Sequence, residues 1–145
     1  MTTMRPHINV ITLAVDDLDR ALAFYGSSLG LASDGIIGTE FPGDDETPAG
    51  ATVMFTLDGG LILGLYPRSE LAKDAHMPVH PASPGGFSIG HFVNSPEEVD
   101  ALLSAASAAG GHVSAPAHKR PWGIYSGYFQ DPDGHLWEII WSPGS

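Results

Sequence analysis

The feature that most constrains the fold is an internal repeat: one order of elements, strand, helix, strand, strand, strand, occurs twice along the 145 residues. Placing Val93 on Val15 gives an offset of 78 residues (93 − 15), and the apolar positions of the two expected helices then coincide. Placing Asp133 on Asp58 gives an offset of 75 residues (133 − 58), which superposes the last strands. The sequence therefore predicts an α+β fold of two βαβββ modules, each with one free sheet face. We expect the two sheets to pair around a central cavity.

Each module is expected to begin with a strand and a helix and to end with a hairpin. In the first module, residues 7–66, the pattern predicts strands at 7–15, 32–39, 51–57 and 61–66 and a helix at 17–29. In the second, residues 86–142, it predicts strands at 87–93, 112–115, 125–130 and 135–141, and a helix from the capping sequence Ser95-Pro96-Glu97-Glu98 to Gly110-Gly111. A connector at 67–85, with a short helical piece at 69–75, would join the modules in a single domain of residues 1–145.

Residues 40–50 form a long loop rich in proline, glycine and aspartate. A loop of this length can act as a lid or rim over a site, or it can be a mobile, solvated segment. The sequence alone leaves both interpretations open.

The last hairpin carries a carboxylate inside an apolar run. Asp131-Pro132-Asp133-Gly134 is a turn signal, because proline presets one backbone angle and glycine accepts a positive φ. Alternation along residues 135–141 places Glu138 on the same face as Leu136 and Ile140. Because the opposite face is also apolar, we expect Glu138 to be buried, which is costly unless the carboxylate is paired, hydrogen-bonded, protonated or bound to a metal. Glu138 is therefore either a site residue or a structural, hydrogen-bonded acid.

Composition narrows the classes of function. Six Lys and Arg residues stand against 17 Asp and Glu, a net charge of −11, which argues against nucleic acid or an anionic membrane as the partner. The chain has no cysteine, which excludes disulfides, thiol catalysis and thiolate metal sites. The first residues contain no apolar segment of signal-peptide length. We therefore expect a cytoplasmic enzyme or binding protein.

The chain resembles a known superfamily. Three features carry the resemblance: the repeated βαβββ order, the segment from Val15 to Tyr25 (VDDLDRALAFY) with Leu29-Gly30-Leu31 after it, and the segment from Asp131 to Glu138 (DPDGHLWE). Together they resemble the vicinal oxygen chelate superfamily, which includes glyoxalase I, bleomycin-resistance proteins and extradiol dioxygenases. The resemblance covers nearly the whole chain and implies the fold, whereas the chemistry stays open because one fold hosts many functions.

In the metal-dependent members, the resemblance implies four ligand positions, one in the first and one in the last strand of each module. They correspond here to Val10, Leu63, Ser88 and Glu138. Glu138 is the only good metal ligand in this set, and a single carboxylate falls short of the sites that catalytic metals need. We therefore predict no metal and no other cofactor; a divalent ion bound through histidines outside this set is the disfavoured alternative.

The seven histidines differ in their expected positions. His7 and His91 each lie an odd number of residues from the mapped positions Val10 and Ser88, which sends them to the helix-covered face of the sheet. His118 is the exception, because its loop should lie over the open end of the second sheet. This makes His118 a candidate ligand-binding residue.

The same alternation predicts an apolar pocket with three polar points, Thr12, Ser88 and Glu138. Trp122 and Tyr128 can stack on a flat ligand, or they can be hairpin core and cross-strand pairs. The full predicted lining of the pocket from the strands is Val10, Thr12, Ala14, Leu63, Ser88, Gly90, Phe92, Leu136, Glu138 and Ile140.

Three functions are compatible with these residues. The one we favour is a metal-free binding protein of the glyoxalase and bleomycin-resistance type, which takes an apolar or aromatic ligand with a polar handle near Glu138. The second is an enzyme in which Glu138 is catalytic as the general base of a proton transfer. The third is a metal-dependent isomerase, lyase or dioxygenase with Glu138 as a ligand. A homodimer is expected from the family and from exposed sheet edges.

Overall fold

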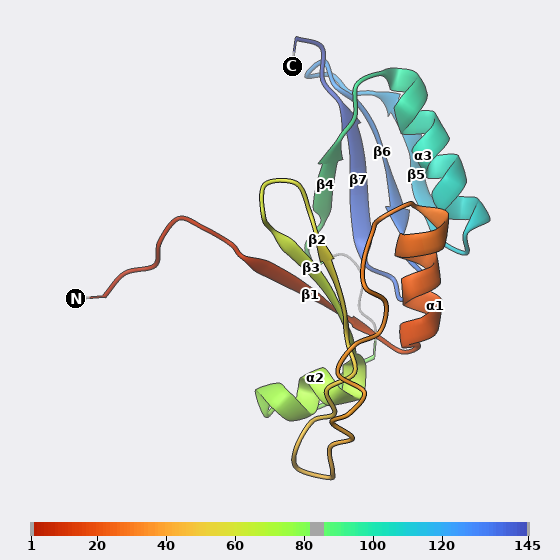
Figure 1. The fold of residues 1–145 in the computed structure, drawn as a ribbon. Coiled ribbons are helices and arrows are strands. Elements are labelled where there is room, and N and C mark those ends of the chain that lie inside the picture. The colour runs from red at the N-terminus through yellow and green to blue at the C-terminus, as the bar shows by residue number, and fades with distance from the viewer. Residues whose placement is uncertain (1, 82–85, 145) are drawn as a thin grey trace. The chain divides into compact units, whose positions relative to one another are not determined.

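The computed structural model describes residues 2–81 and 86–144 and shows an α+β fold with two separate sheets (Figure 1). The strand and helix order fits the two predicted βαβββ modules. By its contacts, the chain divides into unit 1, Met1–Leu22 with Leu31–Val79, and unit 2, Ala23–Gly30 with His80–Ser145. Residues 82–85 of the predicted connector lie outside the described residues.

Unit 1 contains a three-stranded sheet in the order β1-β3-β2. Its strands are β1 (Val10–Val15), β2 (Val53–Thr56) and β3 (Ile62–Pro67), and β3 runs parallel to β1 and antiparallel to β2. Two helices belong to this unit, α1 (Leu18–Leu22) and α2 (Arg68–Ala75). One face of the sheet is fully buried and forms the core with Ala21 of α1; the strand residues on it are Leu13, Val15, Val53, Phe55, Leu63 and Leu65.

The first predicted helix changes its hydrogen-bonding pattern halfway along. It starts as expected at Asp17, whose side chain accepts a hydrogen bond from the Arg20 backbone N–H at 3.0 Å. From Ala23 to Ser28 it continues as the π-helical segment η1, in which the Leu29 N–H donates to the Phe24 carbonyl at 3.1 Å. This wider turn buries Phe24 and Tyr25 in the core of unit 2.

The strand predicted at 32–39 is wrong. The only pairing in this segment is an isolated bridge between Ile37 and Thr52. Gly35 and Gly38 have φ values of 77° and 79°, which interrupt an extended strand. At Gly38 the chain also passes so close to Gly50 that a Cβ atom would lie 2.2 Å from the Gly50 carbonyl oxygen.

Unit 2 contains a four-stranded sheet in the order β4-β7-β6-β5. Its strands are β4 (Ile89–Phe92), β5 (His112–Lys119), β6 (Tyr125–Gln130) and β7 (Leu136–Trp141). The helix α3 (Pro96–Ala108) covers one face and starts as predicted, with the Ser95 hydroxyl accepting from the Glu98 N–H at 3.2 Å. β5 is longer than the predicted 112–115, because two register shifts let it continue beside β6 past Pro116.

A buried hydrogen-bond network fixes the turn between β6 and β7. The Tyr25 hydroxyl donates to Asp131 at 2.5 Å and accepts from the Trp137 indole N–H at 3.0 Å. The other carboxylate oxygen of Asp131 accepts from the backbone N–H groups of Asp133 and His135, each at 2.9 Å. Burial, with the neighbouring Asp131 carboxylate, raises the pKa of Tyr25 well above its usual range, so the phenol stays a donor. The turn predicted from Asp131-Pro132-Asp133-Gly134 is thus tied to η1 within unit 2.

None of the helices within residues 2–81 and 86–144 is long and apolar enough to span a membrane.

Candidate functional site

The open face of the unit 2 sheet carries Glu138. The neighbouring residue Ile139 is 1% exposed in the core, and Trp137 stacks on the core residue Phe129, so alternation turns Glu138 to the opposite face. Across the sheet, Glu138 pairs with Gly90 on β4 and with Tyr128 on β6. The open face therefore presents a carboxylate between a glycine and a tyrosine.

Two hydroxyl-bearing side chains surround the Glu138 carboxylate. The Ser126 hydroxyl donates to Glu138 Oε2 at 2.9 Å. The pKa of the Tyr128 phenol is raised, first by burial and then by its proximity and hydrogen bond to Glu138, while the positive charge of Arg120 lowers it. Glu138 is half-buried rather than fully buried, and it is oriented by these donors. Its position leaves it open to a hydrogen-bond donor from solvent or from a ligand.

Several predicted site residues lie on this same face. Phe92 follows Gly90 by two residues on β4 and is 71% exposed, and Ser88 precedes Gly90 by two residues. His118 on β5 pairs with Ser126, and its Nδ1 lies 3.1 Å from the Pro116 carbonyl oxygen. Unit 2 thus brings together Phe92, His118, Tyr128 and Glu138 on one sheet face, and Ser88 lies just before β4.

Trp122 lies in the turn between β5 and β6 and is 69% exposed. The turn is closed by a hydrogen bond from the Arg120 N–H to the Ile124 carbonyl at 2.8 Å. The exposed indole is available for stacking, and the alternative in which Trp122 is a buried core residue does not apply.

The predicted position of Leu63 on the open face is wrong. Leu63 is 1% exposed and pairs with Ile11 on one side and Phe55 on the other, in the buried face. The register of unit 1 instead pairs Thr12 with Gly64, in the same way that unit 2 pairs Gly90 with Glu138. Gly64 is therefore the counterpart of Glu138, and the true offset of the last strands is 74 residues (138 − 64), one less than the sequence suggested.

These positions do not fit a catalytic divalent metal. Glu138 is the carboxylate that the described strands of unit 2 place on the open face, its close neighbours Ser126 and Tyr128 are neutral hydroxyls, and the counterpart of Glu138 in unit 1 is a glycine. Across residues 2–81 and 86–144, no three His, Cys, Asp or Glu side chains come together in a way that could hold a metal ion. Such a metal needs at least three protein ligands or a larger set of oxygen donors.

The open face of the unit 1 sheet forms a groove of about 340 Å³. Thr12, Gly64 and Met54 form its floor, since they pair side by side across the three strands. Asp74 of α2 adds a carboxylate at its edge. The full lining is Val10, Thr12, Gly50, Thr52, Met54, Ile62, Gly64, Tyr66, Leu71 and Asp74.

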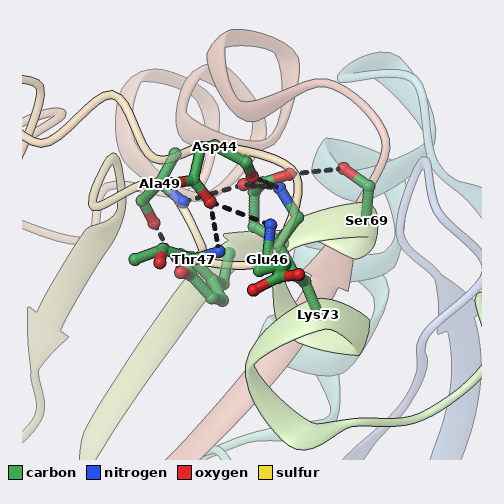
Figure 2. A network of polar contacts seen from close by, with 8 residues as sticks. Asp44, Glu46, Thr47, Ala49, Ser69 and Lys73 are labelled. Atoms are coloured by element: carbon green, nitrogen blue, oxygen red, sulfur yellow. Dashed lines mark hydrogen bonds and ion pairs between the residues drawn. The ribbon is translucent and has the colours of Figure 1, made fainter.

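A network of polar contacts holds the loop at 40–50 against α2 (Figure 2). Glu70 of α2 accepts from the Ala49 N–H at 2.8 Å and from Lys73 at 3.1 Å, and Lys73 donates to the Asp44 carbonyl at 2.7 Å. Tyr66 donates to the Ala49 carbonyl at 2.5 Å. The backbone N–H of Ala49 together with Lys73 lowers the pKa of Glu70. The loop at 40–50 is therefore held against α2 and β3 by hydrogen bonds.

Sequence analysis missed two residues near Glu138. Ser126 was detectable, because it lies two residues before Tyr128 and alternation puts both on one face. Arg120 was not among the predicted site residues, whereas its guanidinium carbon lies 5.7 Å from the centroid of the Tyr128 ring. Its placement depends on the register shifts in β5, for which the sequence has no clear signal.

Comparison with known proteins matches the chain to one family. The model of the Glyoxalase/Bleomycin resistance protein/Dioxygenase superfamily matches residues 7–139. A glyoxalase-related enzyme from Fulvimarina pelagi is 30% identical, with a TM-score of 0.79 over 96% of this chain and 90% of that one. A lactoylglutathione lyase from Agrobacterium tumefaciens is 28% identical, with a TM-score of 0.66 over 95% of each chain. No curated protein matches the chain. The repeated modules and the family match agree, and the chain belongs to the glyoxalase/bleomycin resistance protein/dioxygenase superfamily.

Proposed function

We propose that the protein binds a small organic molecule on the open face of unit 2, with a hydrogen-bond donor of that molecule directed at Glu138. The observation that carries this proposal is the Glu138 carboxylate, which is half-buried and accepts a hydrogen bond from Ser126 at 2.9 Å beside Tyr128. A carboxylate held by hydroxyl donors keeps a fixed orientation and has lone pairs left for a ligand.

The side chains around Glu138 favour an apolar or aromatic ligand body. Phe92 and Trp122 are exposed on this unit, at 71% and 69%. Large exposed apolar side chains beside a few fixed polar groups are typical of a surface that binds small molecules. Thr12 belongs to the other open face, in the groove of unit 1, and stays a candidate for ligand contact there.

Binding without a metal is part of the proposal. It is supported by the small number of metal-binding side chains around Glu138 among the described residues. Elemental analysis of protein purified from metal-supplemented cells tests this point. We expect no stoichiometric divalent ion. A stoichiometric ion that disappears in Glu138→Gln would contradict the proposal and favour a metal enzyme.

An enzymatic role is the second candidate, because the same hydrogen bonds would also position Glu138 as a general base. The names of two relatives, a glyoxalase-related enzyme and a lactoylglutathione lyase, are consistent with it. The two candidates differ in what happens to the ligand. A binding protein releases it unchanged, whereas a general base converts it.

The experiment compares Glu138→Gln with Glu97→Gln, which makes the same charge change on an exposed residue of α3. Ligands come from a screen of small aromatic compounds, in which binding is detected as a shift of the backbone amide NMR signals of β6 and β7. We expect Glu138→Gln to weaken binding about tenfold, equivalent to about 1.4 kcal/mol, and Glu97→Gln to leave it unchanged. Equal weakening by both variants, or by neither, would overturn the proposal. Unchanged binding in Glu138→Gln with loss of product formation would establish the general base instead.

A homodimer is the remaining part of the proposal. The exposed apolar side chain of Met54, at 48%, belongs to the kind of surface that a second copy covers. Sedimentation analysis should show a dimer, and a monomer at micromolar concentration would contradict it. The cytoplasmic location stays a prediction from the sequence.

A further inference from the structure

Arg120 is positioned by the turn that follows β5. Its N–H donates to the Ile124 carbonyl at 2.8 Å, and its carbonyl accepts from the Gly123 N–H at 3.0 Å. Gly123 has a φ of 102°, which closes the turn tightly. The preceding residue, Lys119, pairs with Tyr125, whose hydroxyl donates to Asp100 of α3 at 2.7 Å. Lys119 therefore belongs to the helix side, and Arg120 extends over the open face.

The Arg120 side chain is oriented, but within the part of the chain that the structure describes its Nε has no hydrogen-bonding partner. Its guanidinium carbon lies 5.7 Å from the centroid of the Tyr128 ring, a cation–π distance. Its Nε atom is buried without a hydrogen-bond partner, and no ion pair involves Arg120 among residues 2–81 and 86–144. A buried donor without an acceptor is unfavourable, which makes this arrangement unusual for a purely structural arginine.

Arg68 in unit 1 shows what a structural arginine looks like in this chain. Its Nε donates to Asp16 at 2.8 Å and its Nη2 donates to the Ala14 carbonyl at 3.3 Å. The chain has 17 acidic residues against six basic ones, so acidic partners are abundant. Among residues 2–81 and 86–144 Arg120 has no acidic partner, although it lies against the same tyrosine as Glu138, and this leaves its guanidinium available to a bound molecule.

We propose that Arg120 binds a carboxylate of the molecule whose hydrogen-bond donor meets Glu138. This inference rests on the proposed function and narrows its ligand to a small organic acid that carries a hydroxyl or similar donor beside an aromatic or apolar body. A planar guanidinium matches a carboxylate in a two-point contact. A single carboxylate is favoured over a doubly charged phosphate, because one guanidinium matches one negative charge and Glu138 would repel the second.

The test uses aromatic 2-hydroxy acids, starting with mandelate, each paired with its uncharged carboxamide. Each compound is titrated into the full chain, and binding is measured from the shifts of the backbone amide NMR signals of β6 and β7. We expect the wild-type protein to bind the acids at least tenfold more tightly than the amides. Arg120→Gln should abolish this preference, and Arg120→Lys should restore part of it because the charge returns without the planar fork.

Lys119→Gln is the matched control, since it removes the same charge from the adjacent residue on the helix side of the strand. It should leave the preference for the acids unchanged. The amide spectrum of each variant shows whether the fold is retained. Equal binding of acids and amides by the wild type, a preference that survives in Arg120→Gln, or no binding of any acid at millimolar concentration would overturn the inference.

Adding Glu138→Gln separates this inference from the proposed function. If amides bind as tightly as acids and Glu138→Gln weakens both, the Glu138 site stands and the carboxylate contact of Arg120 is wrong. If acids bind through Arg120 and Glu138→Gln has no effect, the carboxylate contact stands and the proposed role of Glu138 is wrong.

Discussion

The two units share a strand register but use it for opposite purposes on their open faces. In unit 1, Thr12 on the first strand pairs with Gly64 on the last; in unit 2, Gly90 on the first strand pairs with Glu138 on the last. The glycine is therefore on the last strand in unit 1 and on the first strand in unit 2, and the polar residue is on the other strand of each pair. Unit 1 gains a groove above its glycine, and unit 2 gains a hydrogen-bonded carboxylate beside its glycine. The backbone pairing therefore preserves the fold, while one residue per strand decides what the face can bind.

The units also differ in what holds their irregular segments. In unit 2, the turn after β6 is fixed by the buried contact between Tyr25 and Asp131, and Asp131 is 4% exposed. In unit 1, the loop at 40–50 is fixed at the surface by Glu70 and Lys73, whose side chains are 16% and 24% exposed. Buried hydrogen bonds to a charged group contribute more than exposed ion pairs. Unit 2 should therefore lose more stability when its contacts are removed.

The largest effect on stability should come from a glycine on the helix-covered face of the unit 2 sheet, and a glycine on the open face of the unit 1 sheet provides the comparison. At Gly127 of β6, an added Cβ would lie 2.7 Å from Leu103 of α3 and 2.8 Å from the Ala117 backbone nitrogen. Gly127→Ala should therefore lower the free energy of unfolding by about 3 kcal/mol through overpacking. At Gly64 the nearest atom to an added Cβ is the Thr12 hydroxyl at 3.5 Å, an ordinary contact, and Gly64→Ala should be close to neutral. Urea denaturation measures both, and equal effects would break the distinction between the packed and open faces.

A smaller effect is expected from the two tyrosines that tie down turns and loops. Tyr25→Phe keeps the ring but leaves Asp131 without one donor in a buried site, which should cost about 2 kcal/mol. Tyr66→Phe removes only the half-buried bond to the Ala49 carbonyl and should cost about 1 kcal/mol or less. Thermal and urea unfolding of the two variants give the comparison. A larger loss in Tyr66→Phe would show that the surface network of unit 1 is the stronger of the two.

The sequence predicted the regular parts of both units well, because their signals are local. The cap at Ser95 and the turn at Asp131-Pro132-Asp133-Gly134 are set by side chains that bond to backbone a few residues away, and both were found where expected. The strand prediction for residues 32–39 was wrong. The apolar residues of this segment suggest a strand, whereas Gly35 and Gly38 take positive φ values that propensity alone does not reveal.

The candidate site was predictable where alternation holds along a strand. Glu138 and Phe92 lie on the expected open face because β7 and β4 are regular. The predicted position of Leu63 was wrong because a one-residue error in the repeat offset moves a side chain to the opposite face of the sheet. Arg120 and its contact with Tyr128 depend on the shifted register between β5 and β6, a tertiary feature with no local pattern.

The smallest effect should come from Glu70, and it should depend on pH. Hydrogen bonds from backbone N–H groups lower the pKa of Glu70 below its ordinary 4.5 and that of Asp44 below 3.8. Between the lowered and the ordinary pKa, the unfolded chain binds more protons, so stability rises with pH. The stabilisation is present above about pH 4.5 and is lost as the pH falls through the lowered values. Glu70→Gln should cost about 0.5 kcal/mol at neutral pH and flatten this acid dependence. It should also speed hydrogen exchange at the Ala49 amide, which donates to Glu70.

Glu40→Gln, which changes an exposed acid in the same unit, should leave both measurements as in the wild type. Unchanged exchange at Ala49 in Glu70→Gln would mean that Tyr66 and Lys73 hold the loop without Glu70 and that the proposed role of Glu70 is wrong.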